Sequence, residues 1–180
     1  ERMVAAAAVV GTAARSAGLA LPDSGAEATV LTKRTADMML AMGYDLGRQR
    51  SLFGGFDDSQ QEGQGGLEAP FGMRDDHGTV RKHRMGPSFA LDAATHDLLS
   101  VPSARSFGAL YGFDDEAFLF DRDGRRYPMD RHDGKGAYKI EIFLLPTDVH
   151  HLRDGSPVEV YESSGMATVQ RPTCSSSASG

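Results

Sequence analysis

Three Asp-Gly pairs flanked by apolar runs constrain the fold of this chain more than any other feature. They stand at 123–124, 133–134 and 154–155. Tight hairpin turns need positive φ, which glycine adopts without steric cost. In the run 137–145, alternate residues form an apolar face, and its far end is apolar on both faces. We therefore predict a small antiparallel β-meander at 116–170. A methionine-rich helix of the N-terminal half would lie across one of its strands.

The N-terminal half indicates helices. Residues 4–17 are rich in alanine, which has the highest helix propensity. Ser24 and Glu27 have the capping-box spacing, and Gly43 stands where a second helix would end. The apolar face of this second helix would carry Leu31, Thr35, Met38, Met39 and Met42. Two shorter helices are expected at 92–100 and 103–111, with Asp92 and Ser103 as their caps.

The segment 51–70 has the composition of a linker. It holds five glycines, no basic residue and four acidic residues, so it offers little apolar surface to offset the entropy of ordering. The predicted fold is therefore α+β, with N-terminal helices packed on the meander and long irregular linkers. Its expected organisation is a helical region at 1–50, the linker at 51–70, an α+β domain at 71–170 and a Ser-rich tail at 171–180.

Charge and cysteine content narrow the range of partners. The net charge is −6 and no segment has a large positive excess, which disfavours nucleic acid and anionic membrane. The single cysteine, Cys174, excludes an intrachain disulfide. Residues 3–21 resemble a targeting segment as well as a packed helix, so membrane contact is expected only there. Glu1 suggests a processed N-terminus, compatible with an organelle-imported or exported protein. The sequence does not identify a cofactor.

The leading functional interpretation is a non-catalytic structural or linker subunit of a large multiprotein complex. Low-complexity segments become ordered mainly when a partner holds them, so we expect extended arms to contact other protein subunits. Organelle energy-transducing complexes and phycobilisome-like antennae would suit such a chain. The expected partner-binding residues are Leu52, Phe53, Phe56, Met38 and Met42. The chain lacks the nucleophile elbow, phosphate loop and dinucleotide motifs of common enzymes.

Two alternatives remain open. A metal-dependent enzyme or metal-binding module would use His132, Asp148 and His150, if strands brought them together as a two-histidine, one-carboxylate site. A small ligand-binding β-barrel would need a lined cavity. Two further patterns have simpler interpretations: the calcium-like segment 121–124 as a hairpin turn, and the basic cluster 81–84 beside Asp75 and Asp76 as a solvated loop.

Overall fold

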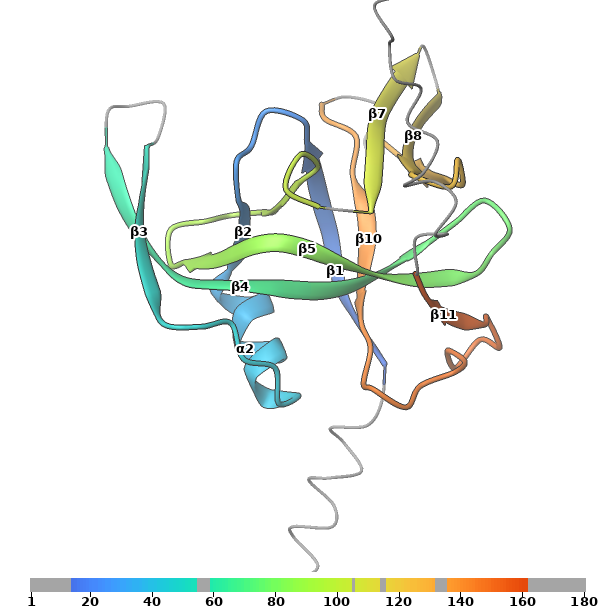
Figure 1. Cartoon of the computed structure of the whole chain (residues 1–180), viewed down its shortest axis with the longest axis horizontal. Helices are drawn as coiled ribbons and strands as arrows, with labels where there is room; N and C mark the ends of the chain where they lie inside the picture. Colours follow the sequence, from blue (N-terminus) through green and yellow to red (C-terminus); the bar gives the residue numbers. More distant parts are fainter. Residues whose placement is uncertain (1–13, 55–58, 105, 114–115, 132–135, 162–180) are drawn as a thin grey trace, which may run out of the picture.

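The described part of the chain is almost entirely β-structure (Figure 1). The computed structural model describes residues 14–54, 59–104, 106–113, 116–131 and 136–161. The strands are β1 (Arg15–Asp23), β2 (Thr29–Thr32), β3 (Gln49–Gly54), β4 (Gln60–Arg74), β5 (Val80–Leu91), β6 (Asp97–Ser100), β7 (Phe107–Phe113), β8 (Glu116–Asp121), β9 (Arg126–Met129), β10 (Ile140–Leu144) and β11 (Val158–Val160). Within these residues α2 (Lys33–Ala41) is the one helix, so the α+β prediction is wrong.

Six strands close into a barrel. Their order is β5-β2-β6-β1-β10-β4, and β4 pairs again with β5. The β1–β6 and β2–β5 pairs are parallel, and the other pairs are antiparallel. Closure gives every strand of the ring two hydrogen-bonded neighbours. β3 and β11 lie outside the ring, on β4 and β5 respectively.

The interior of the barrel is packed with apolar side chains. The fully buried side chains that the barrel strands and α2 contribute to this core include Phe71, Leu31, Met39, Met73, Met85, Leu99, Ile142 and Leu144. β10 follows the predicted alternation, because Ile140, Ile142 and Leu144 face this core. Phe143 and Leu145, on its other face, pack with Val80 in a second cluster. Strand β5, and not the expected helix, therefore covers that face.

The helix of the N-terminal half is shorter than predicted, and it starts later. Residues 29–32 form β2, and Thr32, not Ser24, is the N-cap of α2. Asp97 of β6 is buried and accepts hydrogen bonds from Thr32 N (2.8 Å) and Thr35 Oγ1 (2.6 Å), which ties the start of the helix to the barrel. The helix predicted at 4–17 is also wrong in its described part, since β1 begins at Arg15. The remainder, up to residue 13, lies outside the described residues.

In the described part of the expected linker, residues 51–54 are the end of β3 and residues 60–70 belong to β4. Two of its glycines, Gly63 and Gly65, are needed for close packing. A Cβ atom on Gly65 would lie 2.0 Å from the carbonyl oxygen of Ser88 on β5, and one on Gly63 would lie 2.5 Å from Leu91 Cδ1. β4 therefore approaches β5 more closely than a side chain allows. The glycine content that suggested disorder reflects this close approach.

The predicted meander is only partly present. β7, β8 and β9 form a three-stranded antiparallel sheet, but β10 pairs with β1 and β4, and β11 pairs with β5. The hairpin at 123–124 joins β8 and β9 as expected, whereas the pair 133–134 lies outside the described residues. The helices expected at 92–100 and 103–111 are wrong, because these segments contain β6 and β7.

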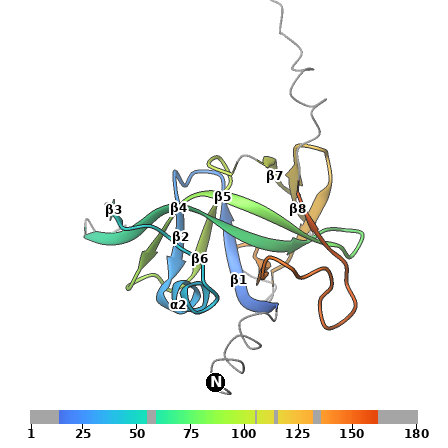
Figure 2. The same ribbon diagram turned by 60° about the horizontal axis from the view of Figure 1, so that its bottom comes forward.

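Two ends of the molecule can be distinguished in Figures 1 and 2. The β3–β4 ribbon extends from one end, and the three-stranded sheet lies beside the barrel at the other. The turn between β4 and β5 lies at this second end, and the backbone N–H of Asp76 donates to the carbonyl of Arg126 on β9 (2.9 Å). Helix α2 has nine residues, and the described residues contain no helix with the length and hydropathy of a membrane span.

Candidate functional site

Two hairpin turns of the same construction meet beside the three-stranded sheet. In the turn 75–79, between β4 and β5, Asp75 Oδ1 accepts hydrogen bonds from the backbone N–H groups of His77 (2.9 Å) and Thr79 (3.0 Å). Gly78 takes φ +83° in the fourth position. The carboxylate thus satisfies backbone donors that the turn leaves without a ladder partner.

The turn 121–125 between β8 and β9 repeats this pattern. Asp121 Oδ1 accepts from the backbone N–H groups of Asp123 (2.9 Å) and Arg125 (3.0 Å), and Gly124 also has φ +83°. The calcium-like spacing of this segment therefore serves a hairpin turn, as interpreted from the sequence. One oxygen of Asp121 is occupied by backbone donors, which leaves its second oxygen to bind another element.

The second oxygens of the two aspartates bind arginines. Asp75 Oδ2 accepts from Arg125 Nη1 (2.8 Å), and Asp121 Oδ2 accepts from Arg81 Nη1 (3.0 Å). Both carboxylates have fully buried side chains. Each hairpin thus provides the arginine that neutralises the aspartate of the other hairpin. Because breaking either pair would leave a buried charge without compensation, the exchange fixes the two hairpins against each other.

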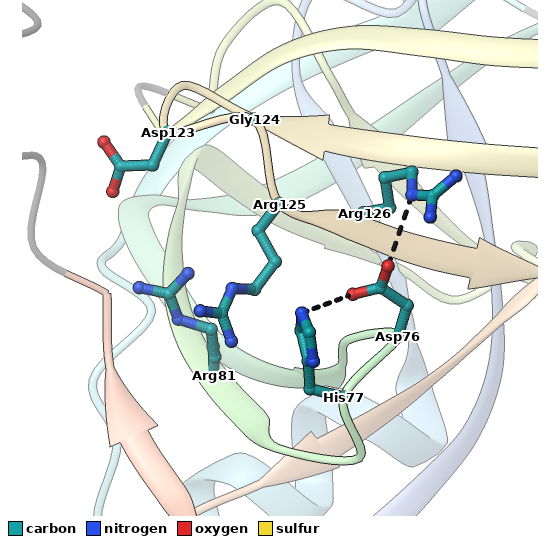
Figure 3. Close-up of a pocket in the computed structure, with 7 residues that line it drawn as sticks. All are labelled: Asp76, His77, Arg81, Asp123, Gly124, Arg125 and Arg126. Atoms are coloured by element: carbon teal, nitrogen blue, oxygen red, sulfur yellow. Dashed lines mark hydrogen bonds and ion pairs between the residues drawn. The ribbon is translucent and has the colours of Figure 1, made fainter.

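These turns enclose a pocket of about 260 Å³, drawn in Figure 3. Arg126 Nε lies 3.2 Å from Asp76 Oδ2, and His77 Nε2 lies 3.6 Å from Asp76 Oδ1. The carboxylate of Asp123 points away from the arginines. Three arginines and one histidine thus line the pocket with two aspartates. The lining residues are Asp76, His77, Arg81, Asp123, Gly124, Arg125 and Arg126.

A buried hydrogen-bonded chain lies beneath the pocket. His83 Nδ1 is 2.8 Å from Ser106 Oγ, and His83 Nε2 is 2.7 Å from Tyr127 Oη, which donates to Asp121 Oδ2 (2.9 Å). Tyr127 donates its hydroxyl proton to Asp121, which also accepts from Arg81. Because that proton is already donated, Tyr127 Oη accepts from His83, and His83 Nε2 carries the proton. His83 Nδ1 then accepts from Ser106, and every bond in the chain has one direction.

The environment of His83 keeps its imidazole neutral. Its exposed fraction is 1%, and its ring stacks on Phe107 (4.4 Å between centroids) and on Tyr161 (4.7 Å). Burial, followed by the positive charge of Arg81, lowers the pKa of His83 to about 3. Burial and the hydrogen bond to Asp121 raise the pKa of Tyr127 above its ordinary value. Both groups therefore stay uncharged around neutral pH.

Ser106, His83 and Tyr127 have the hydrogen-bond order of a nucleophile, a base and a residue that orients the base. However, Ser106 is only 6% exposed and is not part of the pocket lining. A nucleophile must reach its substrate, so the arrangement favours a structural role. The chain connects β5 to both edges of the small sheet, through Ser106 before β7 and through Tyr127 on β9.

The residues predicted to bind partners do not form one surface. Leu52 of β3 is 64% exposed, while Phe53 is half-buried and packs edge-on against Phe89 (5.3 Å). Met38 and Met42 of α2 are half-buried against the main core. Phe56 lies outside the described residues. Of the four described residues of this set, Leu52 is the most exposed.

The structure describes two of the three predicted metal ligands. Asp148 and His150 are exposed in the segment between β10 and β11, and His132 lies outside the described residues. Among the residues that the structure describes, no group of three or more His, Cys, Asp or Glu side chains could hold a metal ion.

Sequence reasoning missed most of the site. The basic cluster 81–84 is part of β5 and not a solvated loop: His83 is buried and the Arg81 side chain is only 12% exposed. The available signal was the two-residue spacing of Arg81, His83 and Met85, which places them on one face of a strand. Because Arg81 is charged, the segment resembled a solvated loop and this alternation was not recognised.

Comparison with known proteins gives no match: no family model, no curated protein and no solved structure is similar to this chain at a significant level.

Proposed function

We propose that this chain is a non-catalytic binding subunit of a larger protein assembly, and that it binds a partner chain through the free edge of β3. The observation that supports this proposal is the position of β3. It is the last strand in the sheet order and, among the described residues, pairs only with β4. An edge strand presents unpaired N–H and C=O groups that can take up another strand.

The side chains of β3 indicate which partner would fit. Leu52 is 64% exposed. Arg50 is the one charged residue of the strand, and it forms an exposed ion pair with Glu62 of β4 (3.2 Å). The edge therefore has an apolar centre and no net charge. Its complement is an extended, uncharged segment of another protein with an apolar side chain opposite Leu52.

The rest of the molecule would hold this edge in place. Phe53 packs against Phe89 of the barrel strand β5, and Gly63 fits between Phe53 and Leu91. The ribbon is thus anchored on the closed barrel at its base and extends beyond it (Figure 1). A partner would bind a preformed strand, which lowers the entropic cost of association.

The test compares two exposed leucines. Light scattering of gently purified material, with identification of co-purifying chains, measures the native assembly. Leu52→Lys should weaken partner binding by about tenfold or more, because it removes apolar contact and places a charge at the edge. Leu40→Lys is the control, since Leu40 lies on α2 and is 56% exposed. It should leave the assembly unchanged.

Three results would contradict the proposal. The native species could be a monomer without co-purifying chains. It could be an assembly of this chain alone that Leu52→Lys dissolves, which would make a second copy the partner. Finally, Leu40→Lys could disrupt the assembly as much as Leu52→Lys does.

A further inference from the structure

We propose that the pocket between the turns 75–79 and 121–125 binds the phosphate group of a small molecule. This site is independent of the binding-subunit role, because it lies at the opposite end of the molecule from β3 (Figures 1 and 2). Two guanidinium groups in fixed positions support this assignment, together with a pocket that has room for a phosphate group.

The two guanidinium groups are held before any ligand arrives. Arg81 is fixed by Asp121 and Arg125 by Asp75, through contacts of 3.0 and 2.8 Å to fully buried carboxylates. Both side chains line the pocket (Figure 3). A guanidinium group donates in a planar fork that matches the oxygens of a phosphate. Such preorganisation lowers the entropic cost of binding an anion.

Arg81 has a donor without an acceptor. Its Nε atom is buried and makes no hydrogen bond within the described residues. The carboxylate of Glu159 is 4.0 Å away, which is too far for a hydrogen bond. Buried donors are normally paired, and an unpaired one calls for an explanation. The atom has almost no accessible surface, so an oxyanion in the pocket would accept from it only after the Arg81 side chain shifts.

The charged side chains and the size of the pocket limit which ligands it can bind. The lining carries three arginines and two aspartates, and the buried Asp121 and Asp75 hold two of these arginines, Arg81 and Arg125. The carboxylate of Asp76 contacts Arg126 and His77, and that of Asp123 points away from the arginines. A pocket of 260 Å³ is smaller than those that take drug-sized ligands. It therefore has room for a phosphate group, whose oxygens would accept from the guanidinium N–H groups of the pocket arginines.

The experiment is a titration of the whole ¹⁵N-labelled chain with inorganic phosphate, followed by NMR at constant ionic strength. We expect saturable shifts of the His77, Gly124 and Arg125 amides, which lie in the two turns. Arg126→Gln should weaken phosphate binding by about tenfold through the loss of one charged donor. Arg125→Lys should weaken it similarly while it keeps the charge beside Asp75. Both variants retain Arg81, so the buried Asp121 keeps its partner.

Arg50→Gln is the matched control, because Arg50 is an exposed arginine on β3, outside the pocket. It should bind phosphate as the unaltered chain does, and sulfate should shift the same amides. Amide spectra of each variant without ligand verify that it is folded. The proposal is overturned if phosphate gives no saturable shift, if Arg50→Gln weakens binding as much as Arg126→Gln, or if acetate binds more tightly than phosphate.

Discussion

His83 shows how one buried residue connects the barrel to the small sheet. Its ring nitrogens lie 2.8 Å from Ser106 Oγ and 2.7 Å from Tyr127 Oη. Ser106 directly precedes β7 and Tyr127 lies on β9, and these are the two edge strands of the three-stranded sheet. The imidazole is neutral, because burial and Arg81 lower its pKa to about 3. Protonation would place a charge in an apolar stack and reverse the direction of one hydrogen bond. His83 should therefore make the fold sensitive to acid.

The first prediction concerns this acid sensitivity. The pKa of His83 is about 3 in the folded chain and ordinarily 6.5. Between these values the unfolded chain binds a proton that the folded chain does not, so the free energy of unfolding falls as the pH falls from 6.5 toward 3. At pH 5 the loss relative to pH 7 is about 2 kcal/mol. Urea unfolding at both pH values measures it.

His83→Gln is the comparison variant for this measurement. Glutamine does not titrate, so the contribution of His83 to the pH dependence should disappear, whatever the variant costs at pH 7. The other histidines are present in both chains and cancel. Parallel loss of stability in the two chains between pH 7 and pH 5 would show that the buried imidazole does not control acid sensitivity.

At the scale of elements, β4 depends on glycine for its path. A Cβ atom on Gly65 would lie 2.0 Å from a backbone carbonyl of β5, which cannot move aside without displacing that strand. Gly65→Ala should thus reduce the free energy of unfolding by at least about 2 kcal/mol. Gly54→Ala, on β3, meets nothing within 4 Å and should change it by less than about 0.5 kcal/mol. Thermal or urea unfolding of both variants tests this, and equal effects would contradict it.

Local signals predicted those elements that local interactions determine. The hairpin at 123–124 and the inward face of β10 follow from glycine conformation and from two-residue alternation, which a sequence displays directly. The predictions for 15–17 and for the described part of 51–70 are wrong, because the alanines of β1 and the glycines of β4 pack against neighbours far along the chain. Arg15, for example, pairs with Leu144. Tertiary contact overrides the propensity of such segments.

The candidate site likewise depends partly on contacts within a turn and partly on contacts between residues far apart in the sequence. The sequence identified the turn at Asp121, whose carboxylate binds backbone groups two and four residues later. It could not show that Arg81 and Arg125 exchange aspartates across two hairpins, since those contacts span 40 and 50 residues. The pocket is formed by that exchange. It therefore follows from the pairing of the hairpins, and not from a motif.

At the scale of the whole molecule, closure of the barrel should determine where the chain opens. Phe71 to Met73 of β4 lie within the ring, between β5 and β10. Residues 60–62 of the same strand pair only with β3. Opening the ring disrupts every strand in it, whereas opening the ribbon leaves the core intact. One strand should thus contain amides of two very different stabilities.

Native-state hydrogen exchange can measure this difference. We expect the hydrogen-bonded amides of 71–73 to exchange with the free energy of global unfolding, as those of β1 should. The amides of 60–62 should exchange with an opening free energy at least about 3 kcal/mol lower. Binding of a partner strand at β3 would raise the opening free energy of residues 60–62, up to the free energy of global unfolding. It would leave the opening free energy of residues 71–73 unchanged. Uniform protection along β4 in the isolated chain would mean that the ribbon and the barrel unfold as one unit, and that β3 is not an independently accessible edge.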